Sequence, residues 1–201
     1  MCGICGVWGG NHSADINAMV EAMVHRGPDF SGTYIGEQVS LGMARLAIID
    51  LSTAGQQPMY SPDGNCVVVY NGEMYNHREK RSELEKLGYS FKSTTDTEVV
   101  VCLYQEYGEQ FVQHIRGMFA VAIYDLRDEK LVLARDQLGI KPLLYCECNG
   151  ALVFASEIKA LLASGLVSSE IDVNSLWNLL AFGAVVQPGT MLENVRMLPP
   201  A

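Results

Sequence analysis

A cysteine at the second position is the residue of this chain best placed to do covalent chemistry. Cys2 follows Met1, so removal of one residue would make cysteine the N-terminus. A terminal cysteine has a thiol that can attack a carbonyl carbon, and its own α-amine, with an ordinary pKa of about 7.7 to 8.0, can accept the thiol proton. The alternative is that Cys2 is a small apolar residue packed in a first strand.

The pair Asn71-Gly72 is the strongest local signal after Cys2. Asn-Gly favours a tight hairpin turn, but the residues that follow, 73–76, lead into a charged helical segment near Arg78 and not into a second strand. At the end of a buried strand, the Asn71 amide and the Gly72 N–H could instead converge on one oxyanion. Glycine allows the close approach to substrate that this requires.

Three charged residues could bind charged groups of a substrate. Arg45 lies within the mostly aliphatic segment 41–51, where its guanidinium could bind a substrate carboxylate in bidentate fashion. A salt bridge to Asp50 or a surface position is the alternative for Arg45. Glu73 and Asp96 could bind a substrate ammonium, although an acid such as Asp96 is favoured at a helix N-terminus in any case.

The spacing Cys2-x-x-Cys5 invites a metal or redox interpretation, which the rest of the sequence does not support. A zinc site would need a second pair, but Cys146 and Cys148 are too close together and the histidines are scattered. A thioredoxin-like motif follows a strand and opens a helix, which this one does not. We therefore expect neither a metal site nor a redox site here.

Hydrophobic periodicity predicts the elements that position these residues. Strands are expected over 4–8, 40–51 and 66–70, hairpins over 118–126 with 130–135 and over 143–147 with 152–155, and helices over 15–24, 78–87, 158–162 and 174–182. Thr95 and Glu98 have the spacing of a capping box before a further helix. Because strands come in adjacent pairs while helices cluster between them, the pattern favours an α+β fold with antiparallel sheets and helices on their outer faces.

Composition narrows the partners and the compartment. The net charge of −9 argues against nucleic acid, whose binding needs clustered lysine and arginine. The sequence has no basic, apolar leader and no apolar run long enough for a membrane span, so we expect a cytoplasmic protein with free thiols. The segment 185–201 ends in Leu-Pro-Pro-Ala and is interpreted as the start of a linker to a further domain.

Six ordered motifs resemble one family. They are 1–6 (MCGICG), 26–29 (RGPD), 45–50 (RLAIID), 70–76 (YNGEMYN), 95–98 (TDTE) and 135–143 (RDQLGIKPL). They resemble the glutaminase domain of glutamine-hydrolysing asparagine synthetases, which are class II glutamine amidotransferases of the N-terminal-nucleophile hydrolase fold. The resemblance covers the whole chain, 1–201, and implies a four-layer αββα sandwich of two antiparallel sheets between helices.

The resemblance also implies a role for each candidate residue. Cys2 would be the nucleophile and its freed α-amine the base, while Asn71 and Gly72 would stabilise the oxyanion. The L-glutamine substrate would be bound by Arg45 through its carboxylate, by Glu73 and Asp96 through its ammonium, and along the backbone of Leu46, Ala47, Ile48 and Ile49. The implied reaction is hydrolysis of glutamine to glutamate and ammonia through a Cys2 γ-glutamyl thioester, with no metal or cofactor.

One family signature is missing, and it leaves the acceptor of the ammonia open. The chain has no S-G-G-x-D-S loop, so ATP and Mg are expected only in a C-terminal synthetase domain outside this sequence. That domain could amidate aspartate or another carboxylate such as a sugar acid. A third possibility is a catalytically silent docking domain that retains Met1. A homodimer is also possible.

Overall fold

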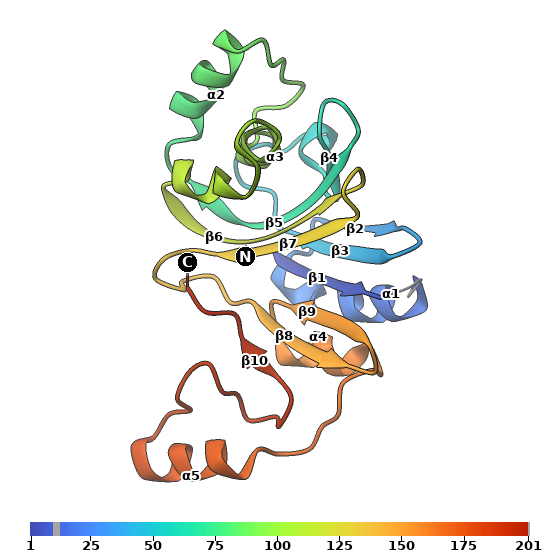
Figure 1. The fold of residues 1–201 in the computed structure, drawn as a ribbon, viewed down its shortest axis with the longest axis vertical. Helices are drawn as coiled ribbons and strands as arrows, with labels where there is room; N and C mark the ends of the chain where they lie inside the picture. Colours follow the sequence, from blue (N-terminus) through green and yellow to red (C-terminus); the bar gives the residue numbers. More distant parts are fainter. Residues whose placement is uncertain (10–12, 201) are drawn as a thin grey trace.

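All strands of the computed structural model, which describes residues 1–9 and 13–200, belong to two antiparallel sheets (Figure 1). The six-stranded sheet has the order β10-β8-β9-β1-β3-β2. Its strands are β1 (Gly3–Trp8), β2 (Phe30–Ile35), β3 (Val39–Arg45), β8 (Leu144–Cys148), β9 (Ala151–Ala155) and β10 (Arg196–Met197). The four-stranded sheet has the order β4-β5-β6-β7 and consists of β4 (Met59–Tyr60), β5 (Cys66–Met74), β6 (Gly117–Asp125) and β7 (Lys130–Arg135).

Helices cover the outer face of each sheet. Against the six-stranded sheet lie α1 (Ser13–Glu21) and α4 (Ile158–Ala163). Against the four-stranded sheet lies α3 (Asp96–Tyr107), which in turn contacts α2 (His77–Lys86) and the 3₁₀ helix η3 (Gly108–His114) (Figure 1). Three hydrophobic clusters fill the spaces between these layers. The arrangement is a four-layer αββα sandwich, which confirms the predicted fold class.

The two-residue period of the strands sorts side chains between the layers. On β1, Ile4 belongs to the cluster between the sheets, whereas Cys5 and Val7 belong to the cluster under α1 and α4. On β5, Val67 and Val69 face the first sheet, and the intervening side chains face α3. Because Cys2 packs against the cluster between the sheets, it lies on the side opposite to Cys5.

Both predicted hairpins are confirmed. Strands β6 and β7 pair from Ala120 opposite Arg135 to Asp125 opposite Lys130, and β8 pairs with β9 along its whole length. The turn between β8 and β9 has positive φ at both Asn149 and Gly150. Those backbone angles are the reason that Asn-Gly is favoured in such turns.

Two strand predictions have the wrong ends. The strand predicted over 40–51 stops at Arg45, because the residues after it form a loop in which Ile48 is 66% exposed. The strand predicted over 66–70 continues to Met74, because β6 pairs with it throughout. Asn71 and Gly72 therefore lie inside a central strand and not at its end, since Asn71 faces Ala120 in the ladder.

The predicted capping box is only half formed. Thr95 caps α3 by accepting a hydrogen bond from the N–H of Thr97. Glu98 instead accepts hydrogen bonds from the N–H groups of Lys92 and Ser93 and from the Ser93 hydroxyl. Its carboxylate thus anchors the loop before the helix, a tertiary role that competes with the local capping contact.

The C-terminal part contains one more helix and one more strand. Helix α5 (Val173–Phe182), close to its predicted bounds, lies apart from the four layers (Figure 1). Within the segment interpreted as the start of a linker, β10 pairs with β8, and the buried Val195 adjoins the pairing. That part of the segment belongs to the sheet, and residue 201 lies outside the described residues. Within the described ranges, no helix is long and apolar enough to cross a membrane.

Candidate active site

A small cavity brings together most of the predicted site residues where β3 ends, β5 passes and α3 begins. Its volume is about 50 Å³. Its lining consists of Cys2, Arg45, Leu46, Ile48, Ile49, Asp50, Gln57, Tyr70, Gly72, Thr95, Asp96 and Thr97. Of the predicted residues, Ala47, Asn71 and Glu73 do not line it. Residues far apart in the sequence therefore meet at one point, as the predicted chemistry requires.

The Cys2 thiol is held by the loop that follows β3. Its Sγ accepts a hydrogen bond from the Leu46 N–H at 3.4 Å and donates to the Leu46 carbonyl at 3.6 Å. The thiol is half-buried and adjoins the cavity. This position leaves the sulfur accessible to a ligand while its direction is set by the main chain.

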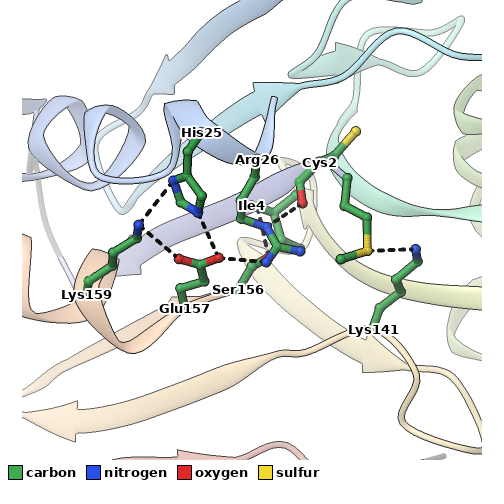
Figure 2. A network of polar contacts seen from close by, with 9 residues as sticks. Cys2, Ile4, His25, Arg26, Lys141, Ser156, Glu157 and Lys159 are labelled. Carbon is green, nitrogen blue, oxygen red and sulfur yellow. Dashed lines mark hydrogen bonds and ion pairs between the residues drawn. The ribbon is translucent and has the colours of Figure 1, made fainter. Parts of the chain in front are cut away.

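Arg26 also positions Cys2, and the sequence analysis did not include it among the site residues. Its Nε donates to the Cys2 carbonyl at 2.8 Å, and its Nη1 forms an ion pair with Glu157 at 2.7 Å (Figure 2). His25 and Lys159 contact the same carboxylate. The Arg-Gly-Pro-Asp motif at 26–29 was the available signal, but the resemblance to the family gave Arg26 no role.

The rest of this motif fastens the loop after β3. A Cβ on Gly27 would lie 2.3 Å from the Ala44 carbonyl oxygen, so only glycine allows this approach. Asp29 donates its N–H to the Arg45 carbonyl and accepts from the Ala47 N–H at 2.9 Å. The Ala47 N–H is therefore occupied by Asp29, and Ala47 holds the loop in place without lining the cavity.

Met1 is present, so the nitrogen of Cys2 is an amide in this structure. The Met1 side chain is 60% exposed, and its sulfur lies 3.6 Å from the Lys141 Nζ. Figure 2 shows this contact beside Cys2. The exposure makes the first peptide bond accessible to processing.

Cys5 differs from Cys2 in its surroundings although it is close in sequence. It is completely buried, and burial raises the pKa of its thiol far above the ordinary range. A thiol of this kind is a poor nucleophile, because the thiolate is the reactive form. In the described part of the chain, no group of three or more histidine, cysteine or acidic side chains is arranged to hold a metal.

Arg45 does not form the salt bridge to Asp50 that was its alternative interpretation. Its Nη2 donates to the Asp50 main-chain carbonyl and its Nη1 to the Ser52 carbonyl at 3.5 Å. The Asp50 carboxylate accepts instead from Ser52 and Thr94. The buried guanidinium has no ion pair among the described residues and lines the cavity.

Two acids border the cavity, and their pKa values are shifted in opposite directions. The hydroxyl of Ser52, followed by the N–H groups of Thr94 and Ser52, holds the pKa of Asp50 well below its usual range. Burial raises the pKa of Asp96, and the N–H of Met74, which donates to it at 2.9 Å, only partly opposes this. Asp96 is therefore the acid that gains more from a cation placed in the cavity.

Glu73 does not join Asp96 at the cavity. It is partly buried on β5 opposite Met118, next to Gly72 in the ladder. The structure therefore brings one of the two predicted ammonium ligands to the cavity and leaves the other outside its lining.

Asn71 carries a buried, unpaired donor on β5. Its side chain is 1% exposed, and its Nδ2 has no hydrogen-bond partner among the described residues. Strand alternation puts Asn71 on the face with Val67 and Val69, towards the sheet that carries Cys2. A buried amide without a partner lowers the stability of the folded state by about 1 to 3 kcal/mol. Because the folded protein already tolerates this loss, the donor is available to a ligand.

Gly72 lets the main chain reach the cavity. A Cβ at this position would lie 2.6 Å from the Met118 carbonyl oxygen and 2.6 Å from Cζ of Tyr70. No larger residue fits without displacing β6 or the Tyr70 ring. The site thus combines a thiol, amide donors, a guanidinium and a carboxylate, a set suited to acyl transfer from a small zwitterion.

A solved amidotransferase structure has the same fold. Glutamine phosphoribosylpyrophosphate amidotransferase from B. subtilis aligns with a TM-score of 0.70 over 82% of this chain and 44% of its own, at 22% sequence identity. At that identity the likeness concerns the fold alone.

Sequence relatives are closer. Asparagine synthetase [glutamine-hydrolyzing] 1 of Bacillus subtilis is 40% identical over 207 residues, which cover 100% of this chain and 32% of the relative. Asparagine synthetase [glutamine-hydrolyzing] 2 of the same organism is 46% identical over 146 residues, which cover 73% of this chain and 19% of the relative. The chain thus spans a third or less of the length of these relatives. It matches the family described as "Glutamine amidotransferase domain" over residues 1–201. The chain belongs to the glutamine amidotransferase domain family and is homologous to the glutaminase domains of asparagine synthetases.

Proposed function

We propose that this domain hydrolyses L-glutamine to glutamate and ammonia through a thioester on Cys2. One observation carries the proposal: a single cavity is lined by the Cys2 thiol, by the Arg45 guanidinium and by Asp96, whose pKa burial raises. No other described cysteine lies in this cavity. Removal of Met1 is part of the proposal, because it frees the amine that serves as the base.

The reaction proceeds in two steps. The freed α-amine takes the thiol proton, the sulfur attacks the side-chain amide carbon of glutamine, and the resulting oxyanion is stabilised by the Asn71 Nδ2 and the Gly72 N–H. The C–N bond then breaks, and the departing nitrogen takes the proton from the α-ammonium and leaves as ammonia. Water next attacks the thioester and gives a proton to the amine. The S–C bond breaks, which releases glutamate and restores the thiol.

Recognition depends on both charges of the free amino acid. Arg45 binds the α-carboxylate and Asp96 the α-ammonium, with Glu73 as the second acid near it. Leu46, Ile48 and Ile49 form one wall of the pocket, and Ala47 holds their loop in place through its hydrogen bond to Asp29. A glutamine residue within a peptide lacks both charges, so this pairing selects the free amino acid.

The cavity must open to admit glutamine. Its volume of about 50 Å³ is small beside the ~300 to 1,000 Å³ of ordinary ligand pockets. Ile48 lines the cavity and is 66% exposed, so its side chain contributes little buried area and is the part of the lining that a ligand displaces most easily. Loss of Met1 removes a further side chain beside Cys2.

The direct test measures ammonia and glutamate release from L-glutamine, with the N-terminal mass of the same sample. We expect turnover when the first residue is Cys2 and none when Met1 is retained. Cys2→Ala should abolish turnover. Cys5→Ala is the matched control, since Cys5 lies on the other side of the sheet, and it should keep the activity. A processed protein without turnover, or an active Cys2→Ala protein, would sink the proposal.

A synthetase domain is the proposed recipient of the ammonia, and the exposed apolar surface of α5 supports a partner there. Trp177 is 67% and Phe182 is 74% exposed. The other exposed apolar side chains of this surface are Ile171, Val173, Leu176, Leu179, Leu180 and Val186. So many large apolar side chains exposed on and beside one helix are typical of a protein interface. We propose that the partner makes asparagine, the product in the names of the relatives, and that it uses ATP and Mg to make it from aspartate.

Mixing the domain with a separately produced synthetase domain tests this partner. We expect asparagine formation from aspartate, ATP and glutamine, and its loss in a Trp177→Ser, Leu180→Ser variant that retains glutaminase activity. Leu87→Ser, at the end of α2 and at the opposite end of the molecule, is the control (Figure 1). Self-association through α5, measured by light scattering, would instead indicate the homodimer. The six free cysteines support the proposed cytoplasmic location.

A further inference from the structure

Tyr70 lines the candidate cavity, and the proposed reaction makes no use of its hydroxyl. The side chain is 2% exposed, beside Gly72 and Asp96. Its hydroxyl is buried and has no hydrogen-bond partner among the residues that the structure describes. Such a group is rare, because burial without a partner costs about 1 to 3 kcal/mol. An unpaired hydroxyl on a residue that lines a ligand cavity indicates that its partner is an atom of the ligand.

The surroundings of Tyr70 fix the direction of its ring. Its N–H donates to Gln57 Oε1 at 2.6 Å, and Gln57 Nε2 donates to the Thr97 hydroxyl at 3.1 Å. Gln57 thus ties β5 to the first turn of α3. The ring head lies against Gly72, where an added Cβ would be 2.6 Å from Tyr70 Cζ. The hydroxyl is therefore positioned by contacts that do not involve its oxygen.

The charges around this hydroxyl favour a cationic partner. Burial, followed by the carboxylates of Asp96 and Glu73, raises the pKa of Tyr70 well above its ordinary value. The phenol stays neutral, and its oxygen keeps lone pairs that can accept a hydrogen bond. Asp96 acts on Tyr70 more strongly than any other charged group. A cation bound by Asp96 would therefore come close to the Tyr70 oxygen.

We propose that the Tyr70 hydroxyl accepts a hydrogen bond from the α-ammonium of glutamine, beside the charge contact to Asp96. This inference rests on the proposed glutaminase function and assigns a further substrate-binding residue to it. An ammonium has several donors to satisfy, and the Asp96 carboxylate already accepts from Met74 and Thr95. Tyr70 supplies a neutral acceptor whose direction is fixed, so it contributes to selection for an amino group at this position.

Tyr70→Phe tests the hydroxyl without disturbing the ring. Because a hydrogen bond to a charged group is lost, we expect KM for L-glutamine to rise about 10-fold or more, with kcat little changed. The melting temperature should stay the same or rise, since the hydroxyl has no partner within the protein. A purely structural role for the hydroxyl would lower the melting temperature and leave KM unchanged.

Two competitive inhibitors identify the group that Tyr70 binds. Glutaric acid monoamide is glutamine without its ammonium, and 4-aminobutanamide is glutamine without its carboxylate. Tyr70→Phe should weaken inhibition by 4-aminobutanamide about as much as it raises KM, and leave inhibition by glutaric acid monoamide unchanged. The reverse pattern, or an equal loss for both inhibitors, would overturn the assignment.

Tyr104→Phe is the matched control. Tyr104 is also buried, but it packs edge-on against Phe111 and does not line the cavity. Loss of the Tyr104 hydroxyl should leave KM and both inhibition constants unchanged. If the processed wild-type protein hydrolyses no glutamine, the proposed function itself fails. If it does and Tyr70→Phe behaves as wild type, only the role of Tyr70 is refuted.

Discussion

The loop after β7 and the cavity after β3 contain similar residues and differ in how completely these are hydrogen-bonded. Arg135 and Arg45 each end a strand, and both direct the guanidinium at main-chain carbonyls. Each of the three guanidinium nitrogens of Arg135 donates to a main-chain carbonyl: to Lys141 at 2.7 Å, to Leu198 at 2.9 Å and to Gly139 at 2.5 Å. We call a group with such a full set of partners saturated. Arg45 has the contact to Asp50 and a weaker one at 3.5 Å.

The acids of the two regions differ in the same way. Burial alone would raise the pKa of Asp136, but the N–H groups of Lys141, Ile140, Phe119 and Leu138 lower it below its ordinary value. Asp96 has fewer donors, and its pKa is raised. The Tyr70 hydroxyl, which lines the cavity together with Asp96, has no partner among the described residues, and neither has the Asn71 amide nitrogen on the other face of β5. Saturated polar groups hold the fold, whereas unsaturated ones remain for a ligand.

The largest expected effect comes from breaking the saturated region. Asp136→Asn puts an amide NH₂ where one carboxylate oxygen accepts two N–H groups, and we expect a loss of unfolding free energy of about 3 kcal/mol or more. Denaturant titration measures it, with the exposed Asp128→Asn as control. Because the folded pKa of Asp136 is lowered, its contribution is present at neutral pH and is lost as pH falls through that pKa. An unchanged midpoint would contradict the structural role.

Asn71→Ala should affect catalysis and leave stability nearly unchanged. We expect kcat to fall by roughly 10²- to 10³-fold, as for other oxyanion donors, with little change in stability. Asn76, which lies just after β5 and precedes α2, is the matched control, because its amide donates to the His114 carbonyl and accepts from the Arg116 N–H. Asn76→Ala should lower stability instead. A defect confined to KM in Asn71→Ala would remove Asn71 from the oxyanion site.

Arg45→Ala should raise KM for glutamine by about 10- to 100-fold, because a charge-assisted contact to the carboxylate is lost. Steady-state kinetics at saturating and limiting glutamine separate this from a change in kcat. Arg116→Ala, which breaks an exposed pair with Glu79, is the control and should change neither constant. If KM does not move, Arg45 belongs with Arg135 among the structural arginines.

Asp96→Asn should show the smallest effect on stability, with a sign opposite to that of Asp136→Asn. The folded pKa of Asp96 is raised, so its ionised form disfavours folding, and the stability it contributes at low pH is lost as pH rises through that pKa. The variant should gain about 0.5 to 2 kcal/mol at neutral pH while its KM for glutamine rises. Thermal unfolding at neutral and acidic pH checks the sign, and a destabilised variant at neutral pH would contradict it.

The elements around the site could largely be predicted from the sequence, but their ends could not. Periodicity indicated the strand that carries Tyr70, yet its extension through Asn71 to Met74 depends on pairing with a strand more than 40 residues away. Glu98 had the spacing of a local cap, and a loop contact took it instead. Arg26 was missed because its partners, Cys2 and Glu157, are local to it only in space.

The sequence by itself determined which reactive groups exist and in what order: a cysteine at position 2, an arginine within an aliphatic segment, an Asn-Gly pair, an acid at a helix start and an arginine at the end of a hairpin strand. These follow from residue identity and short-range periodicity. Only the tertiary structure decided which of them remain unpaired. Hydrogen-bond saturation and desolvation depend on neighbours that are distant in the chain, as Leu46 is from Cys2 and as Leu198 is from Arg135. That difference separates Cys2 from Cys5 and Arg45 from Arg135.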